Sequence, residues 1–257
     1  MIPRALSVAG SDPSGGAGVQ ADLKTFHQHK IYGMAVVTLL TVQNTRGVQA
    51  VYKMKPIQVV RQLEAVLTDL PPQAAKTGAL GDGKVLRAVA RTLRQCRFPL
   101  VVDPVMVSKH GAPLLDPDAV RVFIKELLPL ATLVTPNLAE AQALSGVKVR
   151  DLGSMEKAAR IMAGFGAQAV LVKGGHLPGK AIDLLFWKGK ACFLKAPRIR
   201  TEHTHGTGCT YSAAITAGLA QGKGLLSSVE QAKAFITRAI RTNPGLGHGV
   251  GPVNHFA

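Results

Sequence analysis

The chain has 257 residues, 47% of them hydrophobic, and a net charge of +16 from 31 Lys and Arg against 15 Asp and Glu. This length suits one large α/β domain, and no apolar run reaches the roughly eighteen residues that a membrane-spanning helix needs. The positive residues are scattered and only 5% of the residues are aromatic, which argues against nucleic-acid binding. A polyanion-binding protein that uses the basic surface stays an alternative.

The cysteines and the first segment bear on the compartment. Cys96, Cys192 and Cys209 are widely spaced and odd in number, which argues against a disulfide framework or a zinc site and fits a reducing cytosol. The segment from Leu6 to Gly10 resembles a first buried strand and lacks the features of a secretory signal. We expect a cytoplasmic protein.

Apolar, strand-like runs alternate with segments of helical spacing over most of the chain. We expect strands at residues 4–10, 34–42, 48–55, 74–77, 99–102, 130–134 and 169–173, and helices at 17–29, 56–69, 82–96, 117–128, 140–144 and 154–165, the last capped by Ser154. A hairpin at 181–187 and 191–196 and helices at 208–221 and 228–241 follow. This order predicts one domain over residues 1–257, with a mostly parallel sheet, helices on both faces and an antiparallel edge.

Polar clusters follow the ends of the predicted strands. They are Ser11–Gly16, Gln43-Asn44, Asp103-Pro104, Thr135-Pro136-Asn137, Lys173-Gly174-Gly175 and the loop that holds Cys209. Because ligands of open α/β sheets bind outside the carboxyl ends of the strands, we expect one composite active site at this rim.

The turn His205–Thr210 enters the helix predicted from residue 208. Gly206 and Gly208 allow backbone angles that a side chain would forbid, and the two threonines of the turn can cap the helix. The free N–H groups and the dipole of the helix start form an anion cradle, in which we expect a thiolate at Cys209 to be favoured. The alternative is that Cys209 is an inert, buried hydrophobe.

Phosphoryl transfer requires charge neutralisation, positioning and a proton acceptor. Lys173 is a candidate for contact with nucleotide phosphates, or else an exposed lysine. Asp103 and Glu140 are candidates for binding Mg²⁺ directly or through water. Alternatively, Asp103 caps a turn and Glu140 is an ordinary acid in a first helical turn. The chain has neither a Walker-type phosphate loop nor a Gly-x-Gly-x-x-Gly after its first strand, so a P-loop enzyme and a dinucleotide dehydrogenase are disfavoured.

Taken together, these motifs and the tail Gly249–Phe256 resemble the hydroxymethylpyrimidine/phosphomethylpyrimidine kinases of thiamine biosynthesis, which belong to the ribokinase-like superfamily. The resemblance runs from Ala5 to the tail. It implies a three-layer α/β/α fold, a homodimer, and an ATP- and Mg²⁺-dependent kinase. Such an enzyme phosphorylates 4-amino-5-hydroxymethyl-2-methylpyrimidine and then its monophosphate.

The resemblance also implies roles for particular residues. Cys209 would be the base or an alignment group, beside anion-hole amides of Gly206 and Gly208. The implied pyrimidine pocket comprises Gly10, Ala17, Asp22, Gln43, Ala79 and Val105, and the implied nucleotide contacts are Asn137, Lys173, Thr207 and Gly208. Ala79 stands where the family commonly has Met, and Glu202-His203 replace a usual Lys-Asn. A pyridoxal kinase of the same superfamily and a catalytically silent member stay alternatives.

Overall fold

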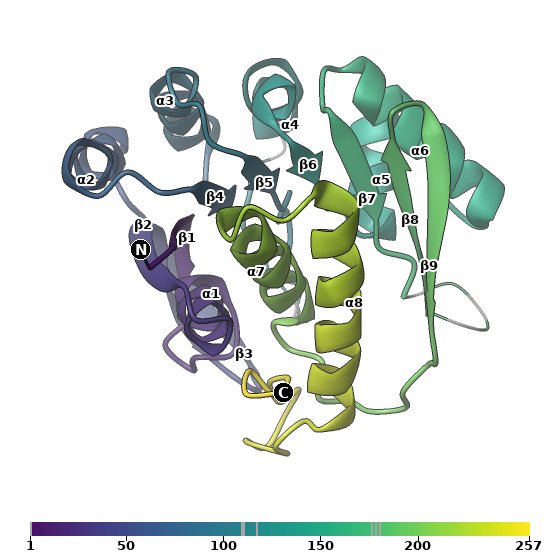
Figure 1. Cartoon of the computed structure of the whole chain (residues 1–257). Coiled ribbons are helices and arrows are strands. Elements are labelled where there is room, and N and C mark those ends of the chain that lie inside the picture. The colour runs from purple at the N-terminus through teal and green to yellow at the C-terminus, as the bar shows by residue number, and fades with distance from the viewer. Residues whose placement is uncertain (1, 109–110, 117, 176, 178, 180) are drawn as a thin grey trace.

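The computed structural model describes residues 2–108, 111–116, 118–175, 177, 179 and 181–257 (Figure 1). Its elements, in chain order, are β1 (Arg4–Ser11), α1 (Gly18–Gln28), β2 (Tyr32–Asn44), β3 (Gly47–Lys53), α2 (Pro56–Asp69), β4 (Ala74–Thr77), α3 (Gly83–Leu93), β5 (Leu100–Val102), α4 (Ala119–Val122), η1 (Phe123–Leu127), η2 (Leu128–Leu130), β6 (Leu133–Val134), α5 (Leu138–Ser145), α6 (Leu152–Gly164), β7 (Ala169–Val172), β8 (Ala181–Trp187), β9 (Lys190–Ala196), α7 (Thr207–Ala220) and α8 (Leu225–Arg241).

These strands form one sheet in the order β3-β2-β1-β4-β5-β6-β7-β8-β9. In this order the six neighbouring strands β2-β1-β4-β5-β6-β7 pair in parallel. At one edge β3 pairs antiparallel with β2, and at the other edge β8 and β9 pair antiparallel with their neighbours. The predicted parallel sheet is therefore confirmed, and it has antiparallel strands at both edges. No helix in the described part of the chain is long and apolar enough to cross a membrane.

Two apolar cores lie on opposite faces of the sheet. One core is built by α2, α3, the segments from α4 to η2, α5 and α6, and the other by α1, α7 and α8 (Figure 1). The expected three-layer α/β/α arrangement is thus confirmed. Helix α7 is the most enclosed helix, because every residue from Thr210 to Ala220 is buried. It packs on the middle of the sheet, so its first turn is fixed near the carboxyl ends of the parallel strands.

The structure departs from the expected elements in three places. The helix expected at 117–128 is a short α4 followed by a π turn and a 3-10 turn, and its first residue lies outside the described ones. Pro129 has no N–H and so cannot extend a regular helix. The strand expected at 130–134 consists only of Leu133–Val134. Ser154 is not the cap of α6: Asp151 is, and Ser154 occupies the third helical position and closes a reciprocal capping box.

Candidate active site

The predicted polar loops converge on one cavity of about 740 Å³ at the carboxyl ends of the strands. Every one of the six loops contributes to its wall, including Asp12, Gln43, Asp103, Lys173 and Cys209. The six loops meet at this rim because the parallel strands point them in one direction.

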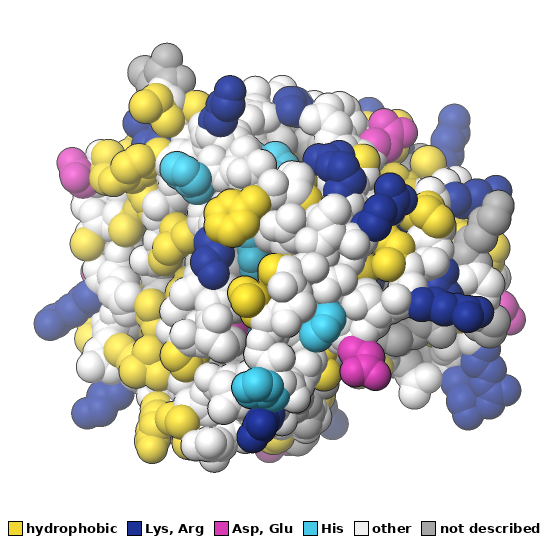
Figure 2. Space-filling view, turned by 90° about the horizontal axis from the view of Figure 1, so that it is seen from below, with side chains coloured by type: hydrophobic (Ala, Val, Ile, Leu, Met, Phe, Trp, Pro, Cys, Tyr) yellow, Lys and Arg dark blue, Asp and Glu magenta, His cyan; other side chains and the backbone are white. Residues whose placement is uncertain are grey.

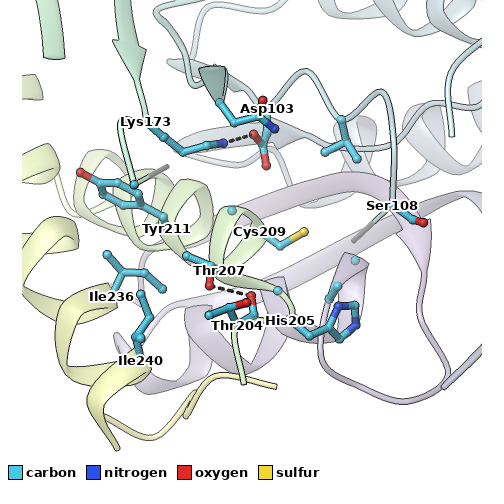
Figure 3. A pocket seen from close by; sticks show the side chains of 18 of the residues that line it. Asp103, Ser108, Lys173, Thr204, His205, Thr207, Cys209, Tyr211, Ile236 and Ile240 are labelled. Carbon is cyan, nitrogen blue, oxygen red and sulfur yellow. Dashed lines mark hydrogen bonds and ion pairs between the residues drawn. The ribbon is translucent and has the colours of Figure 1, made fainter. Parts of the chain in front are cut away.

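The first turn of α7 forms one wall of the cavity. Gly206 is its N-cap in a left-handed conformation (φ +77°), and a Cβ there would lie 1.7 Å from the carbonyl oxygen of Gly16. Neither threonine of the turn caps the helix, contrary to expectation. Thr207 donates its hydroxyl to the carbonyl of Thr204 at 2.7 Å (Figure 3). The buried hydroxyl of Thr210 has no hydrogen-bond partner within the described chain.

The helix start is therefore open toward the cavity. Within the described residues, the amide of Thr207 donates to the carbonyl of Thr204, whereas the amides of Gly208 and Cys209 have no acceptor. Such amides at a helix N-terminus favour an anion.

Cys209 lines the cavity, and its surroundings favour the thiol over the thiolate. Burial raises the pKa of Cys209 to about 11. The ammonium of Lys76 opposes this rise, and the carboxylate of Asp22 adds to it. The expectation that the helix start favours a thiolate here is therefore wrong, because desolvation outweighs the nearby positive charge.

Lys173 and Asp103 form an ion pair in the deep part of the cavity (Figure 3). The distance from Nζ of Lys173 to Oδ1 of Asp103 is 2.9 Å, and Nζ also donates to the carbonyl of Thr135. Burial would raise the pKa of Asp103, but attraction by Lys173 outweighs it and holds the pKa low. A Cβ on Gly208 would lie 3.5 Å from Nζ of Lys173. The ammonium group and the amides of α7 therefore face the same space.

Asn137 and Glu140 bind each other at the start of α5. Oδ1 of Asn137 accepts from the amide of Glu140 (2.9 Å), and Oε2 of Glu140 accepts from the amide of Asn137 (2.8 Å). The oxygen of Asn137 is thus engaged, which leaves its amide nitrogen for a ligand. Burial raises the pKa of Glu140 to about 7, and Asp103 adds to the rise against the attraction of Lys173.

Asp103 and Glu140 fit a magnesium ion that takes only some of its ligands from the protein. No group of three or more potential metal-ligating side chains occurs in the described ranges, so a closed protein cage is not present there. Mg²⁺ typically uses one or two carboxylates together with water and substrate phosphates. Asp103 and Glu140 both line the cavity, and burial raises the pKa of Glu140, so a bound cation would stabilise its carboxylate form. These residues therefore fit a cation that arrives with phosphate.

The opposite end of the cavity is apolar. Leu39, Ala79 and Leu114 form a small cluster there, with Val105 packed against it. Gly10 lets Leu39 pack closely against β1, because a Cβ at Gly10 would lie 2.5 Å from Cδ1 of Leu39.

Five of the six residues expected in a pyrimidine pocket line the cavity. They are Gly10, Ala17, Gln43, Ala79 and Val105. Asp22 lies elsewhere: it is fully buried behind the cavity wall, where it accepts hydrogen bonds from the hydroxyl of Ser7 (2.5 Å) and the ammonium of Lys76 (2.6 Å). The structure thus places Asp22 behind a cavity-lining lysine.

Lys76 is the main site residue that the sequence analysis missed. It lies on the short central strand β4, is fully buried, and lines the cavity beneath Cys209, whose carbonyl it approaches at 3.4 Å. Burial alone would lower the pKa of Lys76, but attraction by Asp22 and other negative neighbours outweighs it and raises the pKa. A lysine in the buried strand AAKT was the available signal, since lysine is almost never fully buried without a partner.

The remaining wall comes from the last helices. Tyr211 of α7 and Ile236 and Ile240 of α8 lie along the side of the cavity away from His205 (Figure 3). The sequence analysis did not assign these residues to the site, because their helical spacing indicates only a packed helix face. They form a largely apolar part of the cavity wall.

The distribution of the basic residues bears on the polyanion-binding alternative. Figure 2 shows Lys and Arg side chains scattered over one face of the molecule, among uncharged and hydrophobic groups. A polyanion-binding surface is expected to show a continuous basic stripe. The arrangement on this face therefore gives no support to the polyanion-binding alternative.

Comparisons with known proteins agree with this geometry. The profile of the phosphomethylpyrimidine kinase family matches residues 12–254. A hydroxymethylpyrimidine/phosphomethylpyrimidine kinase of Synechococcus elongatus is 46% identical over 99% of this chain and 98% of its own length.

Solved structures show the same fold. A phosphomethylpyrimidine kinase from Clostridium difficile is 41% identical with a TM-score of 0.82, covering 93% of this chain and all of its own. The pyridoxal kinase of Staphylococcus aureus in complex with AMP-PCP and pyridoxal is 38% identical with a TM-score of 0.92, covering 100% of this chain and 95% of its own. The chain therefore belongs to the phosphomethylpyrimidine kinase family.

Proposed function

We propose that this protein transfers the γ-phosphoryl group of ATP to 4-amino-5-hydroxymethyl-2-methylpyrimidine, and then phosphorylates the monophosphate to the diphosphate. The observation that supports this most is the layout of the cavity. Open amides of α7 and the ammonium of Lys173 face one part of it, and an apolar pocket for a small ring lies at the other end. Catalysis of phosphoryl transfer consists mainly of positioning and charge stabilisation, which this layout offers.

Each part of the cavity has a role in this proposal. The amides of Gly208 and Cys209 would bind oxygens of the transferring group, and Gly206 and Thr207 would shape the turn that presents them. Lys173 would neutralise the phosphates, and the free amide nitrogen of Asn137 would contact the nucleotide. Asp103 and Glu140 would hold Mg²⁺, which supplies charge neutralisation between the phosphate groups when bound.

Cys209 has a more limited role than that of a free thiolate. With a pKa of about 11, roughly one thiol in ten thousand is ionised at pH 7. In a loose transition state the proton of the attacking alcohol leaves late, so a strong base is not required. We propose that the Cys209 thiol aligns the hydroxymethyl group through a hydrogen bond, and that the alcohol proton leaves late, to an oxygen of the transferring phosphoryl group.

The direct test is a phosphate-transfer assay on the pyrimidine alcohol and on its monophosphate, with mass detection of both products. We expect both products in the presence of ATP and Mg²⁺, and a strongly raised KM for ATP in Lys173→Ala. Absence of both products from folded protein would overturn the proposal.

Pyridoxal is the second candidate acceptor, because the Staphylococcus aureus structure that binds it superposes closely on this chain. Comparison of kcat/KM for the two alcohols decides between them, and a higher value for pyridoxal would reverse our choice. We further propose a single domain, supported by the single sheet, and a cytoplasmic location, supported by the three free cysteines. The homodimer that the family resemblance implies is also part of the proposal. Sedimentation analysis tests the dimer.

A further inference from the structure

A buried carboxylate fixes the loop between β1 and α1. Oδ1 of Asp12 accepts from the amide (2.9 Å) and hydroxyl (2.7 Å) of Ser14, and Oδ2 accepts from the amide of Ala17 (2.8 Å). Burial would raise the pKa of Asp12, but the hydrogen bonds from His205 and Ser14 outweigh this effect and lower it. Asp12 is therefore an ionised group that can only accept hydrogen bonds.

His205 must donate to this carboxylate. Its Nε2 lies 2.8 Å from Oδ2 of Asp12, and an ionised carboxylate has no proton to give. The proton in this hydrogen bond therefore belongs to Nε2 of His205, whichever state its other ring nitrogen has. The ring cannot turn away, because it packs against Gly16, where a Cβ would lie 2.5 Å from Cδ2 of His205.

The same Nε2 also faces the side-chain amide of Gln43. One end of that amide, placed as the nitrogen, lies 3.1 Å from Nε2. The oxygen and nitrogen of a carboxamide have nearly the same shape, so the hydrogen-bond partners decide which end faces a neighbour. A ring nitrogen that carries a proton has no lone pair to accept an N–H of Gln43, so the amide oxygen is the end that can face it, as a second acceptor beside Asp12.

We propose that His205 and Asp12 are positioning residues that turn the oxygen of Gln43 toward the imidazole ring and its NH₂ group toward the cavity. The inference rests on the proposed function for the identity of the ligand. An NH₂ group donates, so the ligand atom opposite Gln43 is an acceptor. In the aminopyrimidine this atom is a ring nitrogen, and the exocyclic amino group, a donor, faces another part of the wall.

The first experiment reads the proton directly and needs no activity. In protein labelled with ¹⁵N-histidine, the spectrum of the ring nitrogens distinguishes a protonated from an unprotonated Nε2, and loss of the signal in His205→Phe assigns it. We expect Nε2 of His205 to carry a proton at neutral pH. An unprotonated Nε2 would overturn the proposal, even if the protein is an active kinase.

The second experiment reads the orientation of Gln43 through the ligand. The KM of the pyrimidine alcohol is compared with those of two analogues in which one ring nitrogen is replaced by C–H, and with that of an analogue without the amino group. We expect one ring-nitrogen analogue to raise KM about tenfold in the wild type, which is the scale of one lost hydrogen bond. In Gln43→Leu and Gln43→Glu this difference should disappear.

The amino group supplies the matched control. Because it does not face Gln43 in our proposal, its removal should change KM by the same factor in the wild type and in both Gln43 variants. The proposal would be contradicted if the Gln43 variants changed the effect on KM of removing the amino group. It would also be contradicted if they changed the effect of neither kind of analogue. Activity on none of the pyrimidines would refute the proposed function while leaving the NMR result valid.

The positioning role has its own signature. His205→Phe should raise KM for the pyrimidine about tenfold and abolish the preference for the ring nitrogen, with KM for ATP little changed. His248→Phe, which replaces an exposed histidine of the tail, should change none of these values. Equal losses in kcat and in both KM values, together with a lowered Tm, would indicate that His205 only stabilises the fold.

Discussion

The buried pair of Lys76 and Asp22 gives the sharpest quantitative prediction. Both side chains are fully buried, and Nζ of Lys76 lies 2.6 Å from Oδ1 of Asp22. Lys76→Met removes the ammonium and leaves Asp22 with only the hydroxyl of Ser7 as a described hydrogen-bond donor. Breaking a buried pair in this way typically costs about 3–5 kcal/mol of the free energy of unfolding.

Protonation of Asp22 limits that cost. Burial already raises the pKa of Asp22, and Lys76 opposes the rise, so the carboxyl in Lys76→Met will hold its proton at higher pH than in the wild type. We therefore expect a loss of about 3 kcal/mol at pH 7, shrinking as the pH falls toward 5. Since domains are typically stable by about 5–15 kcal/mol, the variant should still fold.

Urea unfolding of the two single variants and the double variant forms the assay. Lys76→Met combined with Asp22→Asn leaves no uncompensated charge, so we expect it to recover to within about 1 kcal/mol of the wild type. A loss below about 1 kcal/mol in Lys76→Met, or a double variant no more stable than the single one, would refute the reasoning. The double variant also isolates the catalytic effect of Lys76, because its stability is restored while the ammonium beneath Cys209 is absent.

Three further predictions follow from the helix start and the tail. Gly206→Ala should lower Tm, since its Cβ meets the Gly16 carbonyl, whereas Gly208→Ala should keep Tm and raise KM for ATP. Cys209→Ala should lower kcat much more than it weakens ATP binding; Cys209→Ser should retain more activity if alignment suffices, and equal losses would indicate that ionisation is required. Burial lowers the pKa of His255 to about 4, so stability should fall as the pH drops from 6.5 to 4, by up to about 3 kcal/mol. His255→Gln should flatten this dependence in unfolding curves, and an unchanged slope would contradict the buried neutral state.

The sequence located the site because its position depends on topology. Residues that directly follow a parallel strand must lie at the same edge of the sheet, so Asp103, Lys173 and Gln43 could be assigned without knowledge of their contacts. The anion cradle was predictable for a similar reason, since a glycine turn before a helix leaves amides open wherever the helix packs.

The contacts between these residues were not predictable. Asp22 and Lys76 are 54 residues apart, and Asp12 and His205 are 193 apart. No local sequence pattern predicts that such residues pair, and this pairing determines whether each side chain is protonated. Cys209 illustrates the consequence: the helix start alone indicates a thiolate, but desolvation in the folded protein holds the proton on sulfur. Local sequence specifies the groups at the site, whereas their protonation depends on the complete fold.

The pairing of Lys173 with Asp103 bears on how the site receives a nucleotide. Without phosphate, the ammonium of Lys173 donates to Asp103 and to the carbonyl of Thr135, and Asp103 is its described charged hydrogen-bond partner. A phosphate that binds Lys173 competes with Asp103, whose carboxylate then needs another positive partner. The proposed magnesium ion would supply it, and it would also favour the ionised form of Glu140, whose pKa is about 7. Nucleotide and cation should therefore bind cooperatively. The phosphate pairs with Lys173, and the cation pairs with the carboxylate of Asp103 that the phosphate displaces.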